Sequence, residues 1–244
     1  VGGGTFTPLD QCLVAGMVCN DSRLVSKDGR WAVEGDPTEG ALIVSGRKGG
    51  LSESDLTQRL PRKDVLPFES DRQYMATLHE DNGKNVIYAK GAVEVILPKC
   101  DRMLSESGDP EPLDAQSLLS KAEAIAAKGL RVLAFAKKVV GEDASTLVHE
   151  SVASDLVFLG FQAMIDPPRK EAIEAVKSCH NAGIQIKMIT GDHALTASAI
   201  AKKLGLKSHA SNPDSVPFVK TGQELAGFST DSVTYKAKGT PAFA

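Results

Sequence analysis

The chain lacks the long apolar runs, cysteine pairs and basic clusters that mark several classes of protein. No stretch approaches the ~18 apolar residues of a membrane-spanning helix, and no secretory leader opens the sequence. A net charge of -3 with scattered Lys and Arg does not provide a nucleic-acid surface. We therefore expect a water-soluble, cytosolic polypeptide that has no nucleic-acid partner.

Cysteine is scarce, and its spacing is not that of a metal site. The four cysteines are Cys12, Cys19, Cys100 and Cys179. No two of them are arranged as C-x-x-C, and most lie in apolar periodic segments. Buried reduced thiols are expected, in place of a disulfide framework or protein-bound metal. The five histidines are isolated and add no ligand cluster.

The 244 residues are enough for two ordinary domains, and two styles of sequence are present. Residues 1–154 mix helical spacing with hairpin strands, which predicts an α+β domain with an antiparallel sheet and flanking helices. The clearest hairpin joins Tyr74–Leu78 to Asn85–Ala89 through Asn82-Gly83. Further elements are expected at residues 9–17, 39–45, 91–97 and 114–128 as helices, and at residues 131–139 as a strand.

Residues 155–244 read as strand, helix, strand, helix, followed by a poorly ordered tail from about Ser229. Val157–Ile165 and Ile184–Thr190 are short apolar runs, and Gly183 and Gly205 end the two helices. Such a βαβα order is typical of a right-handed parallel crossover, so we expect a partial α/β, Rossmann-like unit.

Two acidic loops follow the predicted strands of this unit. Parallel strands finish at one edge of a sheet, so Asp166 and Thr190-Gly191-Asp192 are expected side by side, where open α/β sheets bind ligands. Gly191 allows close approach of an anion, and Thr190 adds a hydroxyl donor. Asp166 and Asp192 are equally suited to be helix N-caps, and these residues alone do not decide between the two roles.

Several separated motifs occur in a fixed order along most of the chain. They are Gly35-Asp36-Pro37-Thr38-Glu39-Gly40, Pro67-Phe68 with Arg72 and Met75, Tyr88-Ala89-Lys90-Gly91-Ala92, Gly129-Leu130-Arg131-Val132, Asp166-Pro167-Pro168-Arg169 and Met188-Ile189-Thr190-Gly191-Asp192. Each is weak singly, but the ordered set closely resembles type II P-type cation-transporting ATPases, the calcium and sodium/potassium pump group. The resemblance implies a nucleotide-binding domain followed by part of a phosphorylation domain of haloacid-dehalogenase type.

The resemblance also implies roles for single residues in holding ATP. Phe68 matches an adenine-stacking phenylalanine, Lys90 with Gly91 matches the adenosine pocket, and Arg131 matches an arginine that reaches the phosphates. Glu39 matches a glutamate on the adenine amino side. The residues by themselves are also consistent with a core Phe68, a surface Lys90 or Arg131, and a first-turn Glu39 favoured by the helix dipole.

The chain departs from the family where the phosphates would lie. Ser70 and Gln73 occupy positions at which a calcium pump of this family has an arginine and a lysine. Gln73 can donate a hydrogen bond, but a neutral amide attracts a polyanion less than an ammonium does. We expect weak nucleotide affinity, roughly -6 to -4 kcal/mol.

Two segments of the family are absent from the sequence. These are the Asp-Lys-Thr-Gly-Thr segment with the phosphorylated aspartate and the Gly-Asp-Gly-Val-Asn-Asp segment with the main Mg²⁺ ligand. Asp166, Thr190, Gly191 and Asp192 would then be half of a phosphoryl-transfer site. The resemblance implies an ATP- and ADP-binding cytoplasmic piece of a membrane pump, without turnover of its own. Its partners would be the remaining phosphorylation, actuator and transmembrane domains, or a second copy packed on the truncated sheet.

Two other functions stay open at the level of sequence. A haloacid-dehalogenase-type phosphatase with a cap domain would need its own nucleophilic aspartate, for which Asp166 is a loose candidate followed by Pro167 in place of a second acid. A non-catalytic nucleotide-sensing module would bind nucleotide in the same way. Phosphate-ester hydrolysis distinguishes the first of these from a pump.

Overall fold

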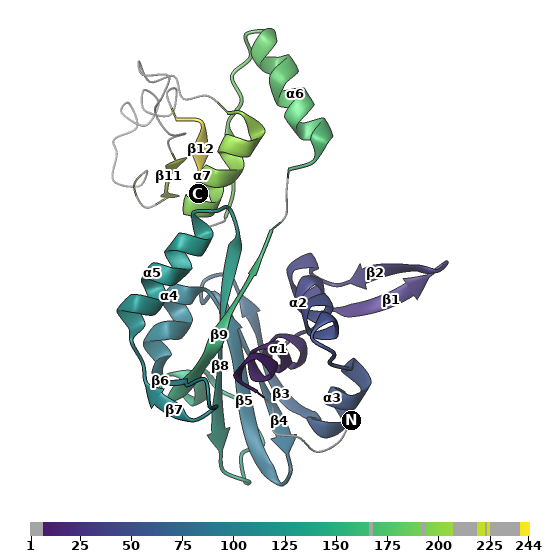
Figure 1. Cartoon of the computed structure of the whole chain (residues 1–244), viewed down its shortest axis with the longest axis vertical. Helices are drawn as coiled ribbons and strands as arrows, with labels where there is room; N and C mark the ends of the chain where they lie inside the picture. The colour runs from purple at the N-terminus through teal and green to yellow at the C-terminus, as the bar shows by residue number, and fades with distance from the viewer. Residues whose placement is uncertain (1–6, 166–167, 192–193, 207–218, 223, 225–239) are drawn as a thin grey trace. The chain divides into compact units, whose positions relative to one another are not determined.

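The computed structural model describes residues 7–165, 168–191, 194–206, 219–222, 224 and 240–244 (Figure 1). The chain forms two compact units. The first comprises Val1–Ser120 and Val132–Gln162, and the second comprises Lys121–Arg131 and Ala163–Ala244.

The first unit is built on a mixed seven-stranded sheet with the strand order β3-β4-β5-β8-β9-β6-β7. The strands are β3 (Arg62–Glu69), β4 (Tyr74–Asp81), β5 (Lys84–Gly91), β6 (Cys100–Leu104), β7 (Pro110–Pro112), β8 (Arg131–Val140) and β9 (Leu156–Met164). Neighbours from β3 to β8 pair antiparallel, whereas β6 runs parallel to β9. The predicted α+β class is confirmed, but the sheet is mixed where the sequence predicts an antiparallel one.

The β4–β5 hairpin is the predicted one. Asn82 and Gly83 both have positive φ, at 53° and 81°. A two-residue turn with both central residues in this region matches the twist of the flanking strands, which is why Asn-Gly is favoured there. The register pairs Tyr74 with Gly91 and Met75 with Lys90.

Three helices accompany the sheet: α1 (Pro8–Val18), α2 (Pro37–Lys48) and α3 (Glu53–Arg59). Thr7 and Asp10 form a capping box at the start of α1, and Asp36 caps α2, each followed by proline at a first-turn position. Helices and strands share one apolar core, whose largest fully buried side chains include Val14, Leu42, Ile43, Met75, Leu78, Ile87, Phe135 and Leu156.

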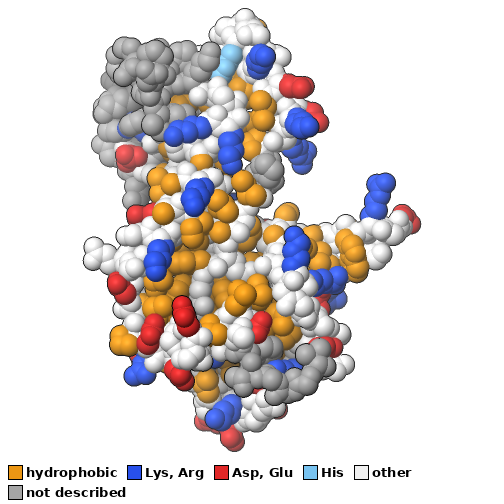
Figure 2. All heavy atoms as spheres, in the orientation of Figure 1, with side chains coloured by type: hydrophobic (Ala, Val, Ile, Leu, Met, Phe, Trp, Pro, Cys, Tyr) orange, Lys and Arg blue, Asp and Glu red, His pale blue; other side chains and the backbone are white. Residues whose placement is uncertain are grey.

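A second hairpin, β1 (Arg23–Lys27) and β2 (Arg30–Glu34), extends beside α2 (Figure 1). Its turn contains Asp28 and Gly29 with positive φ, and this hairpin is not among the predicted elements. Apolar side chains are exposed along it (Figure 2), among them Trp31, which is 65% exposed beneath the Arg47 guanidinium. The unit is completed by α4 (Val93–Ile96), the first half of α5 (Ala115–Ala126), and the 3₁₀ helices η1 (Leu97–Lys99) and η2 (His149–Val152).

The second unit contains α6 (Lys170–Asn181), α7 (Ala194–Leu204) and a small parallel sheet in the order β10-β12-β11. Its strands are β10 (Met188–Ile189), β11 (Val219–Lys220) and β12 (Ala242–Phe243). Gly183 and Gly205 end the helices with positive φ, as predicted. Ala242 is fully buried in a cluster with Val176, Ala201 and Leu206. Most of the tail predicted from about Ser229 lies outside the described residues.

The predicted pairing of the two strands around α6 is wrong. β9 lies in the large sheet beside β8 and β6, whereas β10 pairs with β12 in the small one. Leu156 and Phe158 of β9 are buried in the first unit. A short apolar run indicates a buried strand but does not identify the strand with which it pairs, so adjacency in sequence was an inadequate guide.

Within the described ranges, no helix is both long and apolar enough to cross a bilayer.

Candidate functional site

A buried ion pair joins two of the predicted site residues. Lys90 Nζ lies 2.5 Å from Glu39 Oε1, and the two side chains are only 7% and 15% exposed. The residues come from β5 and α2, 51 positions apart in the chain. Two opposite charges withdrawn from water are stable only when they compensate one another, so this contact fixes α2 against the sheet.

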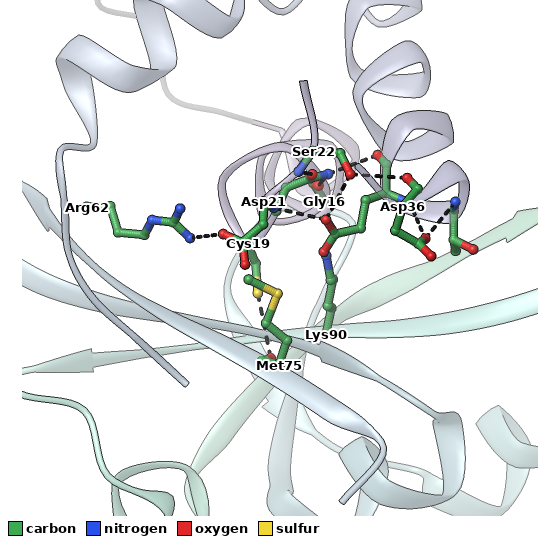
Figure 3. A network of polar contacts seen from close by, with 11 residues as sticks. Gly16, Cys19, Asp21, Ser22, Asp36, Arg62, Met75 and Lys90 are labelled. Atoms are coloured by element: carbon green, nitrogen blue, oxygen red, sulfur yellow. Dashed lines mark hydrogen bonds and ion pairs between the residues drawn. The ribbon is translucent and has the colours of Figure 1, made fainter. Parts of the chain in front are cut away.

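The second oxygen of Glu39 is held by a turn between α1 and β1. The Asp21 N–H donates to Glu39 Oε2 at 3.0 Å, and Ser22 Oγ donates to the same oxygen at 3.1 Å. Asn20 Nδ2 donates to the main-chain oxygens of Gly16 and Glu39 at 3.0 and 2.9 Å. Figure 3 shows Lys90 directed from its strand toward this turn and the start of α2.

Local sequence explains why Glu39 is presented there. The Asp36 side chain accepts hydrogen bonds from the Thr38 and Glu39 amides and so begins α2. Gly35 has a φ of 116°, and a Cβ at this position would lie 2.4 Å from Ser22 Oγ. Glycine is therefore required for Ser22 to reach the Glu39 carboxylate.

Phe68 lies near the end of β3 and is 59% exposed. The strand register is interrupted between Leu66 and Glu69, and Glu69 pairs with Tyr74 of β4. Since the next residue of β4, Met75, pairs with Lys90, Phe68 and Lys90 lie at the same end of the sheet. The exposure excludes the alternative that Phe68 is a core residue.

Gln73 and Gly91 are in main-chain contact. Gln73 has a positive φ of 55° and accepts a hydrogen bond from the Ala92 amide at 3.0 Å. A Cβ at Gly91 would lie 2.4 Å from Gln73 O and 2.7 Å from Tyr74 Cβ. The glycine therefore permits close approach of two strands, and the Gln73 side chain is left exposed.

The remaining predicted residues are assigned to the second unit or lie outside the described residues. Arg131 is exposed at the first position of β8, and Gly191 is exposed after β10. The Thr190 amide donates to Phe243 O at 3.0 Å. Asp166 and Asp192 fall outside the described residues.

Several residues of the Glu39 network were missed at the level of sequence. The role of Asp36 at the start of α2 could have been predicted from the sequence, because Asp before Pro-Thr is typical of a helix start. Asn20 and Ser22 lie in a polar turn whose distant partner the sequence does not reveal. Cys19 Sγ donates to Met75 O at 3.6 Å, and burial raises the pKa of this thiol, which disfavours the nucleophilic thiolate.

The observed side chains fit an adenine nucleotide better than a metal. An exposed aromatic ring and a lysine–glutamate pair at one end of a sheet can stack on a purine and hydrogen-bond its edge. Among the described residues, no group of three or more His, Cys, Asp or Glu could hold a metal ion.

Comparisons with known proteins show what the chain is similar to. A family model described as P-type ATPase, cytoplasmic domain N, matches residues 8–171. The chain is 48% identical over 236 residues to cation-transporting ATPase pma1 of Synechocystis sp., covering 97% of the chain and 25% of that protein. It is 43% identical over 219 residues to probable cation-transporting ATPase F of Mycobacterium bovis, covering 90% and 24%.

A third relative is calcium-transporting ATPase 1 of Lactococcus lactis, 37% identical over 234 residues, which are 93% of the chain and 25% of that protein. The chain thus spans about a quarter of the length of these relatives. A family model that covers most of the chain, together with relatives aligned over nearly all of it, shows the family. The chain belongs to the P-type cation-transporting ATPases.

Proposed function

We propose that the first unit binds ATP or ADP at the end of the sheet that carries Phe68, Lys90 and Glu39. The observation that carries this proposal is the buried Lys90–Glu39 pair, with side chains 7% and 15% exposed. A buried ion pair adds little to stability compared with apolar residues of the same volume, so a role in recognition is a reason for its presence.

Each residue is proposed to have one task. The exposed ring of Phe68 stacks on the purine, since base–aromatic stacking needs a free aromatic face. Glu39 accepts from the adenine amino group, and Lys90 donates to the nucleoside. Gly91 holds β5 close to Gln73, whose exposed amide donates to the phosphates. Arg131 is assigned to the phosphates on the family resemblance alone.

The activity of the whole protein is a wider proposal. The relatives are named as cation-transporting and calcium-transporting ATPases, and the chain corresponds to a quarter of their length. We propose that residues 1–154 together with β9, which lies in the large sheet, act as nucleotide-binding domain. The residues after Met164 would act as part of a haloacid-dehalogenase-type phosphorylation domain, on the cytoplasmic side of a membrane pump. Asp166, Thr190, Gly191 and Asp192 would then contact the transferring phosphoryl group.

This wider proposal includes the ligands and partners. ATP supplies the phosphoryl group, accompanied by Mg²⁺, to an aspartate that this chain does not contain. The chain alone is then expected to bind nucleotide without turnover. Its partners are the remaining phosphorylation, actuator and transmembrane domains.

An ATP titration followed by amide chemical shifts tests nucleotide binding. Phe68→Ala is expected to weaken binding by ~1–3 kcal/mol while leaving the thermal unfolding temperature nearly unchanged, because its ring is mostly exposed. Trp31→Ala, which removes a similarly exposed aromatic residue of the β1–β2 hairpin, is the matched control and should bind as the wild type does. Absence of ATP binding, or equal affinities for the two variants, would contradict the proposal.

A further inference from the structure

The hydrogen bonds around Glu39 leave one acceptor position of its carboxylate open. A carboxylate has about four lone-pair sites, two on each oxygen. Oε2 accepts from the Asp21 amide and the Ser22 hydroxyl, at 3.0 and 3.1 Å. Oε1 accepts from Lys90 Nζ at 2.5 Å. Among the contacts of the described residues, the remaining site is the second lone pair of Oε1.

We propose that Ser22 is a positioning residue that makes this site selective for 6-aminopurines over 6-oxopurines. The proposal rests on the nucleotide-binding function above. Ser22 does not touch the nucleotide. Instead, its hydroxyl and the neighbouring Asp21 amide occupy Oε2, so the carboxylate cannot rotate and Oε1 keeps one orientation.

A fixed carboxylate discriminates between bases according to whether the group that it meets is a hydrogen-bond donor or an acceptor. The 6-amino group of adenine donates a hydrogen to Oε1, whereas the 6-oxo group of hypoxanthine presents a second acceptor. Two acceptors in contact leave both unsatisfied, which is costly in a partly buried site. A carboxylate free to turn can avoid the oxo group or admit water, and its discrimination is then smaller.

The placement of Ser22 is itself closely determined. Ser22 is 7% exposed, and its amide donates to Asn20 Oδ1 at 2.9 Å. Its hydroxyl oxygen lies 3.1 Å from both Asp36 O and Glu39 Oε2, so its single hydrogen is directed between these two acceptors. Asn20 Nδ2 also donates to Glu39 O. One short turn therefore holds both the main chain and the side chain of Glu39.

The test compares the affinities for ATP and inosine triphosphate, which differ at the 6-position of the purine. Ser22→Ala is expected to lower the ratio of ATP to inosine triphosphate affinity by about three- to tenfold. Most of the change should come from weaker ATP binding. A ratio measured on one preparation does not depend on the fraction of folded protein. Ser26→Ala, an exposed serine of β1, is the matched control and should keep the wild-type ratio.

The outcomes separate this inference from the function on which it rests. Equal losses for the two nucleotides would show that Ser22 is merely structural and would overturn the inference, while Phe68-dependent ATP binding would still stand. A wild-type chain that binds neither nucleotide would overturn both. If Ser22→Ala unfolds, Ser22→Cys replaces the hydroxyl by a weaker donor of similar shape. The same shift of the ratio in that variant would support the inference, and an unchanged ratio would refute it.

Discussion

Replacing Lys90 alone should destabilise the first unit far more than replacing Lys90 and Glu39 together. In Lys90→Met the Glu39 carboxylate stays 15% exposed but loses the ammonium 2.5 Å away. Breaking a buried pair in this way typically costs ~3–5 kcal/mol, because one charge is left uncompensated. Whole domains are stable by only about 5–15 kcal/mol, so the single variant should be close to unfolding at moderate temperature.

The double variant Lys90→Met/Glu39→Gln removes both charges and keeps an amide oxygen as acceptor for Asp21 and Ser22. Its stability is expected to lie above that of Lys90→Met, with a coupling energy of about 2–3 kcal/mol between the two positions. The midpoint temperature of thermal unfolding should be about 6–20 °C lower in Lys90→Met than in the wild type. The single tryptophan, Trp31, lies in the first unit, so its fluorescence follows this unit specifically.

Additive effects of the two substitutions, with coupling below ~0.5 kcal/mol, would refute the reasoning. The result also governs how binding data are interpreted. Loss of ATP binding in Lys90→Met is informative only at temperatures at which the variant is folded. Phe68→Ala avoids this difficulty, because its exposed ring contributes little to the core.

Three further outcomes are expected. Burial lowers the pKa of His79 in the folded chain below its ordinary 6.5, so the unfolded chain is protonated at a higher pH than the folded chain. The free energy of unfolding, measured in urea, should therefore fall as the pH drops below ~6.5, and His79→Gln should weaken this pH dependence. Gly91→Ala should cost ~1–3 kcal/mol because its Cβ would meet the Gln73 main chain, whereas Gly222→Ala, whose Cβ would have no atom within 4 Å, should cost less; similar losses of stability in the two variants would contradict this. Burial raises the pKa of Cys12 to about 12, so iodoacetamide at pH 8 should label it slowly until urea is added, and rapid native labelling would disprove its burial.

The predictions from sequence succeeded where a local signal determines the structure. The Asn82-Gly83 turn fixed a hairpin, and Gly183 and Gly205 marked helix ends. The Asp28-Gly29 turn of the β1–β2 hairpin carries the same kind of signal. These features depend on a few neighbouring residues, so the sequence contains enough information to find them.

The contacts that build the candidate site depend on residues far apart in the chain. Glu39 meets Lys90 only because α2 packs on the sheet, and Ser22 reaches Glu39 only because Gly35 leaves room. The family resemblance supplied the candidates Glu39, Lys90 and Phe68, but not the turn that holds Glu39. The partner of β9 was mistaken for the same reason, since strand pairing is decided by tertiary packing.

The position of β9 also bears on how the first unit is made. β9 is inserted between β8 and β6, yet it is the last strand of this sheet to leave the ribosome. Until it pairs, β8 and β6 each present a row of unpaired main-chain groups, and such open edges are templates for aggregation. An expression clone that ends before Leu156 would make that state permanent. Polypeptides intended to contain the folded first unit should therefore continue at least through Met164.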